Sequence, residues 1–485
     1  MRCWSYTLVL ALALLAGACA AAGVAWPLMA ALAVCALVVL GATVRSVLIR
    51  AILLLSLLLV PDLPSGQSLG LLVHWSAGLT LSNFIIPALG LPLMAGAWLA
   101  GKRLLARPWP GFATWSLLLL GWCLLTLAAP AVSGQVSGAQ AATLLAHLAK
   151  LAVFLLLGVV LASPDDEWRQ RAGTLLIVGI AGNDAIGLAQ AAGWLTAFSP
   201  LAQASAGNSA RASGLFYDAN MYGVLCAWAL LWLLTCTPGA GLRDRRSFQS
   251  WRAFFGYTAL VAATAANLLA SESRAGFAAL AAGAGILLWL GQRRAVARVV
   301  LLMVLAAALF PQRTWHRVSA ALATLDSAAS SAGPVGAHSD ASTAQRLASM
   351  DQALHQIAAH PLLGLGFGRS LYLGVQQLGT GTVRPALQGD FQGAQNMGLT
   401  VLTETGPVGL LLFLLALAAP LRRLAPLARE SSAAAVMLAG FVGMLVACFT
   451  IEELWNARVL AQVVMLTAGG LAAVRADAAE LELAA

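Results

Sequence analysis

Charged residues are scarce in this sequence. Only 10% of the 485 residues are Asp, Glu, Lys or Arg, whereas a soluble domain carries roughly 25%. Hydrophobic residues make up 60% of the chain, and the mean hydropathy is +0.84. This composition excludes an ordinary soluble domain and is typical of a polytopic membrane protein. The net charge of +9 does not predict nucleic-acid binding, because the basic residues form short clusters between apolar runs.

Patterns that bind metals or form disulfide frameworks are also missing. The seven cysteines fall in or beside apolar runs and show no CxxC or Cys/His spacing, so neither a zinc site nor a set of disulfides is predicted. The segments assigned below to the outer side contain no DxD pair and no cluster of His with carboxylates. We therefore predict an activity that needs no metal and no other cofactor.

Long apolar runs are what the sequence has in abundance. A membrane-spanning helix needs about 20 apolar residues. Fourteen runs qualify, the shortest being 47–61, and we predict an all-α bundle of 12 to 14 transmembrane helices. The runs are 3–22, 24–43, 47–61, 76–99, 111–130, 142–162, 172–193, 217–236, 254–271, 275–291, 295–312, 396–419, 432–451 and 457–474.

The distribution of arginine and lysine orients these spans. With the N-terminus in the cytoplasm, the basic residues gather in alternate loops, and the outer loops 62–75, 131–141 and 452–456 hold none. Loops rich in Lys and Arg stay in the cytoplasm. We therefore predict a bacterial inner-membrane protein with both termini cytoplasmic.

One outer loop, 313–395, is much longer than the others. Its first part is rich in Ala, Ser and Gly, which is typical of a flexible segment. Apolar residues then recur at helical spacing from Leu347 to Ile357, and Pro361 ends the run. This pattern predicts an amphipathic helix over about 343–359, lying on the membrane surface or over a cavity.

Several polar residues occur within the outer halves of predicted spans. Such residues are costly in lipid and mark a functional path or a packing contact between helices. Lys150 and Asp184 come at similar depth on consecutive spans, so we predict an ion pair between them. Together with Glu404, they predict a polar cavity that opens toward the periplasm.

Four outer segments interrupt the apolar sequence with polar residues. They are Arg-Ala-Ser-Gly-Leu-Phe-Tyr-Asp-Ala-Asn at 211–220, Ser-Glu-Ser-Arg-Ala-Gly at 271–276, Arg346 through His-Pro-Leu-Leu-Gly-Leu-Gly-Phe-Gly at 360–368, and Gln-Asn at 395–396 followed by Glu-Thr-Gly-Pro-Val-Gly at 404–409. Arg211, Arg274 and Arg346 thus come from separate segments on one side. Arginine suits phosphate, because its planar fork donates two hydrogen bonds at once.

The order of these segments resembles the O-antigen ligase and polysaccharide polymerase superfamily of bacterial membrane proteins. The resemblance covers about 208–415. It divides the chain into N-terminal spans (1–207), a ligase- or polymerase-like core with the large loop (208–415), and C-terminal spans with a cytoplasmic tail (416–485). It implies a GT-C-like fold that takes a glycan from undecaprenyl diphosphate at the periplasmic face without a metal.

The resemblance implies that Arg211 and Arg274 hold the diphosphate, with Arg346 less securely placed. The residues themselves suggest the other roles, with Lys150 as a further candidate for the diphosphate. Asp218 and Asn220 would position Arg211 or the sugar, and His360 is a turn residue or faces the cavity. Gln395 and Asn396 would orient the acceptor, while Glu404 buttresses the mouth of its span. Glu272, Asp218, Asp390 and His360 remain open as candidates for a general base.

One departure bears on the activity. The family's ligases usually have His-Asn where this chain has Gln395-Asn396, and glutamine cannot take a proton at neutral pH. A polymerase that extends a lipid-linked glycan is therefore favoured, with transfer to lipid A core as the alternative. A flippase or exporter of the same lipid-linked glycan is the rival from another class. Predicted partners are the glycan donor, the acceptor and membrane lipids; a chain-length regulator is left open.

Overall fold

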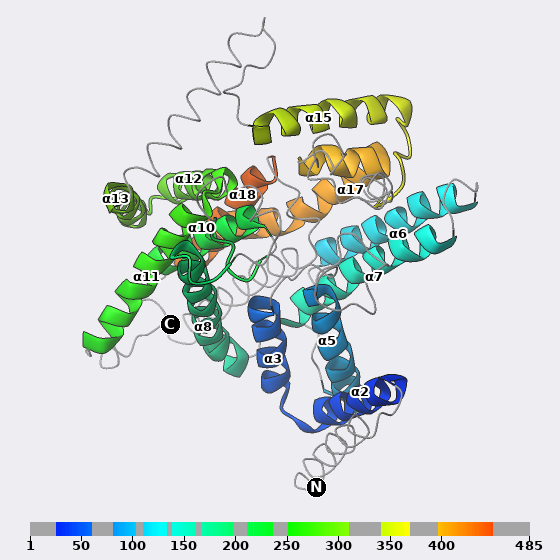
Figure 1. The fold of residues 1–485 in the computed structure, drawn as a ribbon, viewed down its shortest axis with the longest axis horizontal. Coiled ribbons are helices and arrows are strands. Elements are labelled where there is room, and N and C mark those ends of the chain that lie inside the picture. The colour runs from blue at the N-terminus through cyan, green and yellow to red at the C-terminus, as the bar shows by residue number, and fades with distance from the viewer. Residues whose placement is uncertain are drawn as a thin grey trace, which may run out of the picture.

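The computed structural model describes residues 26–60, 81–102, 110–132, 138–161, 166–196, 211–216, 218–235, 251–309, 341–368 and 396–449. These residues are helical, without a strand among them (Figure 1). The helices are α2 (Trp26–Thr43), α3 (Ser46–Leu59), α5 (Leu81–Leu99), α6 (Pro110–Val132), α7 (Gly138–Leu161), α8 (Asp166–Ala191), α10 (Ala219–Thr235), α11 (Trp251–Ser271), α12 (Arg274–Trp289), α13 (Arg293–Leu309), α15 (Ala341–Ala359), α17 (Met397–Leu427) and α18 (Ser432–Ala447).

The helices confirm the predicted fold class. Each predicted span between 24 and 451 coincides with a helix, including the short run 47–61, and the spans 3–22 and 457–474 lie outside the described residues. Within the described part of the chain, three stretches are long and apolar enough to cross a membrane: Phe112–Pro130, Arg171–Ala191 and Met397–Leu427. The long α17 differs from the prediction, because it continues to Leu427 and is interrupted at Gly406.

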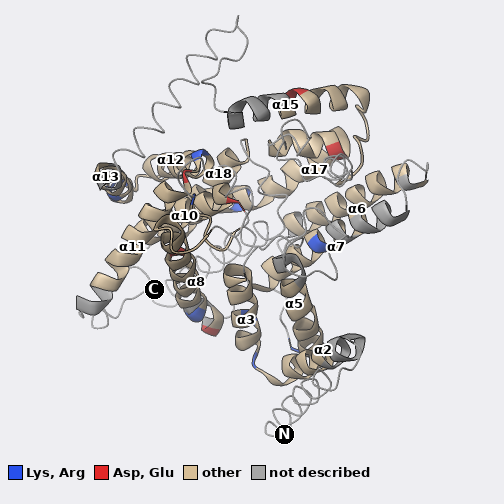
Figure 2. Ribbon diagram, in the orientation of Figure 1, with Lys and Arg blue, Asp and Glu red and all other residues tan. Residues whose placement is uncertain are grey.

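Large apolar side chains lie exposed along these helices, as a lipid environment requires. Examples are Leu117, Leu125, Val304 and Leu411, which are between 54% and 69% exposed. Charged residues are few along the helical ribbons (Figure 2). A water-soluble protein does not leave so many large apolar side chains in solvent, so the described helices form a membrane protein.

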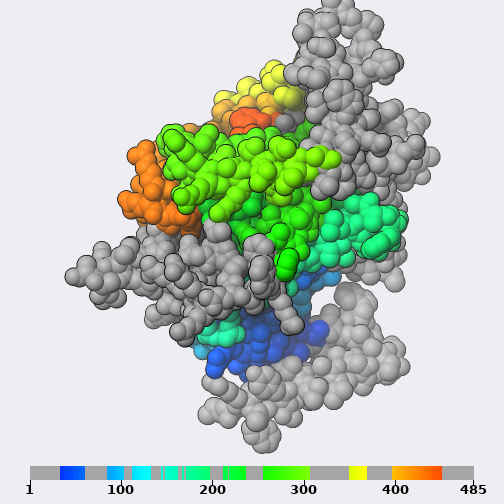
Figure 3. All heavy atoms as spheres, turned by 90° about the vertical axis from the view of Figure 1, so that its left-hand side faces the viewer, coloured from blue at the N-terminus to red at the C-terminus, as the bar shows by residue number. Residues whose placement is uncertain are grey.

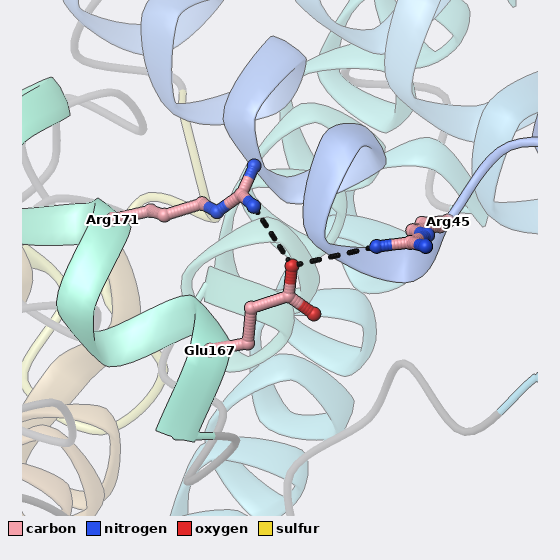
Figure 4. Close-up of polar contacts among 3 residues, drawn as sticks. All are labelled: Arg45, Glu167 and Arg171. Atoms are coloured by element: carbon pink, nitrogen blue, oxygen red, sulfur yellow. Dashed lines mark ion pairs between the residues drawn. The ribbon is translucent and has the colours of Figure 1, made fainter.

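Contacts between loops agree with the predicted division into two sides. Glu167 lies 2.9 Å from Arg171 and 3.9 Å from Arg45 (Figure 4), which joins two loops that the charge pattern places together. The amine of Lys102, from a third loop of that group, donates to the carbonyls of Gly41 and Val44. Arg429, which follows α17, lies over the ring of Trp289 at the end of α12. The charge pattern places these two loops on the same side as well.

Small residues let α10, α12 and α18 approach one another closely (Figure 1). A Cβ at Gly276 would lie 2.7 Å from the carbonyl of Gly223 on α10, and one at Gly443 would lie 2.5 Å from the Ala279 carbonyl on α12. Such small-residue contacts are the usual basis of helix packing in membranes. In the space-filling view, the green surface of α11 to α13 lies beside the orange of α17 (Figure 3).

The crossing of α10 and α12 generates a stability prediction. Gly276→Ala would force backbone apart at Gly223, and overpacking of this kind costs about 1–3 kcal/mol. We expect a lower midpoint of thermal unfolding in detergent, measured by the loss of the monodisperse peak on size-exclusion chromatography. Gly285→Ala is the matched control on the same helix, because a Cβ there meets nothing within 4 Å. Equal midpoints for the two variants would contradict the close crossing.

Candidate functional site

The side chain of Arg211 is fixed against the turn that joins α11 and α12. Its Nε donates to the carbonyl of Ser271 at 2.9 Å, and its Nη2 donates to Asn220 Oδ1 at 3.1 Å and toward the Glu272 carbonyl at 3.5 Å. The backbone next to Arg211 is held at the same place, because the Ala212 N–H donates to the Ala270 carbonyl. The structure therefore brings the first two predicted segments, 211–220 and 271–276, into direct contact.

The turn itself places Arg274 at the start of a helix. Ser273 caps α12 by accepting from the Gly276 N–H at 2.9 Å, and its hydroxyl also donates to the Asn220 carbonyl. Glu272 has a φ of 51°, a left-handed conformation that is uncommon for residues other than glycine and costs about 1 kcal/mol or more. The turn is thus strained and tightly held, with Arg211 and Arg274 both partly buried beside it.

Two amides on α8 hold the segment that carries Arg211, and the sequence analysis missed both. The side-chain oxygen of Gln190 accepts from the N–H groups of Ser213 and Gly214 at 2.9 Å, while its NH₂ donates to the Gly214 carbonyl at 3.0 Å. Asn183 accepts from the Leu215 N–H at 3.3 Å. Both amides are fully buried. Their spacing of seven residues, which puts them on one helix face, is the signal that could have identified them.

The predicted ion pair between Lys150 and Asp184 is wrong. No ion pair joins these two described residues; the Asp184 carboxylate accepts instead from Thr264 at 2.5 Å and from Tyr222 and Asn267 at 3.2 Å. Similar depth does not make two helices neighbours, and α8 packs mainly on α3 and α11 rather than on α7. The buried Asp184 cluster ties α8, α10 and α11 together.

The third and fourth segments meet where α17 is broken. Gly406 has a φ of 68° inside the helix, and Pro407 has no N–H to offer the Thr403 carbonyl. That carbonyl accepts from the Leu365 N–H at 2.8 Å, and the Glu404 carbonyl accepts from the Gly366 N–H at 2.9 Å.

The side chain of Glu404 strengthens the same contact. It is fully buried, and its carboxylate accepts from the Gly368 N–H at 3.0 Å. This supports the predicted buttressing role for Glu404. The glycines at 364, 366 and 368 all have positive φ, so they shape a compact turn.

Helix α15 is confirmed, but its predicted apolar stripe is only partly buried. The helix lies along the N-terminal half of α17 (Figure 1), and Ala353 is buried there, against Leu399. Leu354 is 55% exposed. Small residues permit the closer approach of two helices, so Ala353 faces α17 in place of the leucine; Ser349, four residues earlier on α15, is also buried. Arg346 lies on α15, outside the described side chains.

The remaining predicted residues have mixed outcomes. Asp218 accepts from the Asn220 N–H at 2.8 Å and caps α10. Asn396 caps α17 by accepting from the Leu399 N–H, and its NH₂ donates to the Phe449 carbonyl. His360 is exposed at the end of α15, while Gln395 and Asp390 lie outside the described residues. Over the described ranges, His, Cys, Asp and Glu form no group of three that could hold a metal.

Comparison with protein families matches residues 259–414 to the family Wzy_C, described as O-antigen ligase. The match confirms the resemblance derived from the sequence. It includes the α11–α12 turn, α15 and the break in α17, whereas Arg211 precedes it and joins it through the contacts with Ser271 and Glu272. A comparison with curated proteins gave no match.

The role of Gln190 can be tested by hydrogen exchange. Gln190→Ala leaves two buried N–H groups and one carbonyl without their partner, and each such loss costs about 1–3 kcal/mol. We therefore expect the amides of 212–216 to exchange about 10- to 100-fold faster, measured by mass spectrometry in detergent. Gln352→Ala, at an exposed position on α15, is the control. Unchanged exchange at 212–216 in Gln190→Ala would show that Gln190 does not hold this segment.

Proposed function

We propose, from the match of residues 259–414 to the family described as O-antigen ligase, that this protein transfers a glycan from undecaprenyl diphosphate at the periplasmic face. The helices and the family together indicate a glycan-processing enzyme of the bacterial inner membrane. The observation that carries the proposal is the meeting of Arg211 and Arg274 at one tight turn, with Arg211 bonded to the carbonyls of Ser271 and Glu272.

The chemistry requires fixed positive charge. Glycosyl transfer passes through a cationic sugar while negative charge builds on the leaving group. Preorganised donors in a site that excludes water stabilise such charge far better than mobile water does. Arg211 is preorganised in this sense, because Asn220 and the turn carbonyls fix the plane of its guanidinium.

The position of Arg274 points in the same direction. It is the first residue of α12, whose first turn contains no acidic residue. The N-terminus of a helix carries partial positive charge, so a basic residue there is unfavourable by about 0.3–1 kcal/mol unless an anion is bound nearby. A diphosphate at this turn would interact with both arginines and with the helix end.

The acceptor decides between two activities. We favour a polymerase that extends a lipid-linked glycan, because Gln395 stands where ligases of the family usually have histidine. Ligation to lipid A core is the second candidate, supported by the description of the matched family. In either case Asn220 positions Arg211. Asn396 would act from the cap of α17, and Lys150 and Arg346 remain candidates for further contacts with the donor.

Complementation with arginine variants tests the donor site. In a strain lacking the gene, we expect Arg211→Ala and Arg274→Ala each to lower glycan transfer about 10²- to 10³-fold, the usual effect of losing one transition-state donor. Arg274→Lys should recover part of the activity, because it keeps the charge but not the fork. Arg171→Ala is the control, since this exposed arginine pairs with Glu167 at the start of α8, away from the end of that helix where Gln190 holds the segment of Arg211.

Gel analysis of the products separates the alternatives, provided that each variant is present in the membrane at the wild-type level. Single repeat units on the lipid carrier, with loss of long chains, identify a polymerase. Long chains that stay on the carrier and fail to reach lipopolysaccharide identify a ligase. Normal glycan from both alanine variants would contradict the diphosphate site and favour a transporter of the same lipid-linked glycan.

A further inference from the structure

Two leucines lie exposed in a segment whose backbone is firmly held. Leu362 and Leu363, which follow α15, are 75% and 44% exposed. The segment is fixed on both sides, because the Gly364 N–H donates to the His360 carbonyl and the Leu365 N–H donates to the Thr403 carbonyl. A rigid turn that presents two neighbouring leucines outward needs an apolar partner, since their exposure to water is unfavourable by about 25 cal/mol per Å² of apolar surface.

The place of these leucines in the fold indicates that partner. The Leu362 carbonyl lies against Gly406, where a Cβ would collide with it. Gly406 stands about 14 Å along the axis from the start of α17, at 1.5 Å per residue. Beyond it, Val408, Leu411 and Leu414 are 43% to 57% exposed on a helix apolar enough to span a membrane.

The exposed charged side chains of α15 do not lie at the break in α17. On α15, Asp351 and His355 are exposed, with side chains 75% and 80% accessible, and both precede the turn by at least one helical turn. Between His360 and Val408, the residues that meet at the break are apolar, glycine or proline apart from buried Thr403, Glu404 and Thr405. The exposed surface at the break therefore continues the lipid-facing surface of α17.

From this continuity we propose that Leu362 and Leu363 insert among the acyl chains of the membrane. The turn 361–364 forms a lip in the bilayer that covers the break in α17, so that the freed carbonyls of Thr403 and Glu404 meet backbone donors rather than lipid. Helix α15 lies above it at the membrane surface. The partner is the lipid of one leaflet, and the inference does not depend on the proposed glycan transfer.

Site-specific fluorescence quenching tests the lip. The fluorophore NBD is attached at Leu362→Cys in full-length protein whose seven native cysteines are replaced, reconstituted in phosphatidylcholine vesicles. Leu411→Cys serves as the lipid-facing control and Asp351→Cys as the aqueous control. We expect doxyl-labelled lipid to quench position 362 as strongly as position 411, and aqueous iodide to quench it far less than position 351.

Two outcomes overturn the proposal. Strong quenching by iodide, as at position 351, would show that the leucines face water. Protection from both quenchers would show that protein covers them, and cross-linking through Leu362→Cys would then distinguish a second copy of the chain. The same measurements at Leu363→Cys keep the test decisive if the first variant does not reconstitute as a monodisperse protein.

Discussion

Lipid offers no hydrogen bonds, and the irregular parts of this fold are arranged around that constraint. A helix satisfies its own backbone hydrogen-bonding groups, but the segment 211–216 and the break at Gly406 do not. Each receives its hydrogen bonds from another part of the chain. The amide of Gln190 binds the first segment through three hydrogen bonds, and the turn after α15 donates two backbone N–H groups to the broken α17. Non-helical backbone is tolerated within the membrane only where other parts of the protein provide its hydrogen bonds.

The hydropathy and charge patterns predicted most of the helical framework, because span length and loop charge are local properties. Even the short run 47–61 is a helix, α3. Neighbour relations are not local, which is why the pairing of Lys150 with Asp184 failed. The same limit applies to Asn396. That it orients the acceptor stays a prediction, and the structure adds that its side chain caps α17 and donates to the Phe449 carbonyl. A cap and a ligand-binding amide look alike in sequence.

The charged residues of the candidate site were easier to predict from the sequence than the neutral residues that hold them in place. Arg211 and Arg274 stand out in apolar sequence, and the structure brings their segments together at one turn. Gln190 and Asn183 carry no charge and lie within a span, so nothing but their spacing distinguishes them from packing residues. Yet they fix the segment that presents Arg211. Preorganisation of a charged group depends on such neutral partners, whose own hydrogen bonds leave little freedom.

The strain at Glu272 fits the same arrangement. A non-glycine residue in the left-handed region persists only where surrounding contacts enforce it. Here Ser273 caps α12, and Arg211 donates to the carbonyls of Ser271 and Glu272, which belong to the peptides before and after Glu272. Those contacts hold a turn that begins a helix with arginine, against the preference of the helix dipole. Backbone strain at Glu272 and an arginine opposed to the helix dipole are two separate energetic costs at one turn. A bound diphosphate would offset the electrostatic part of them, which makes this turn the place where donor recognition should be sought.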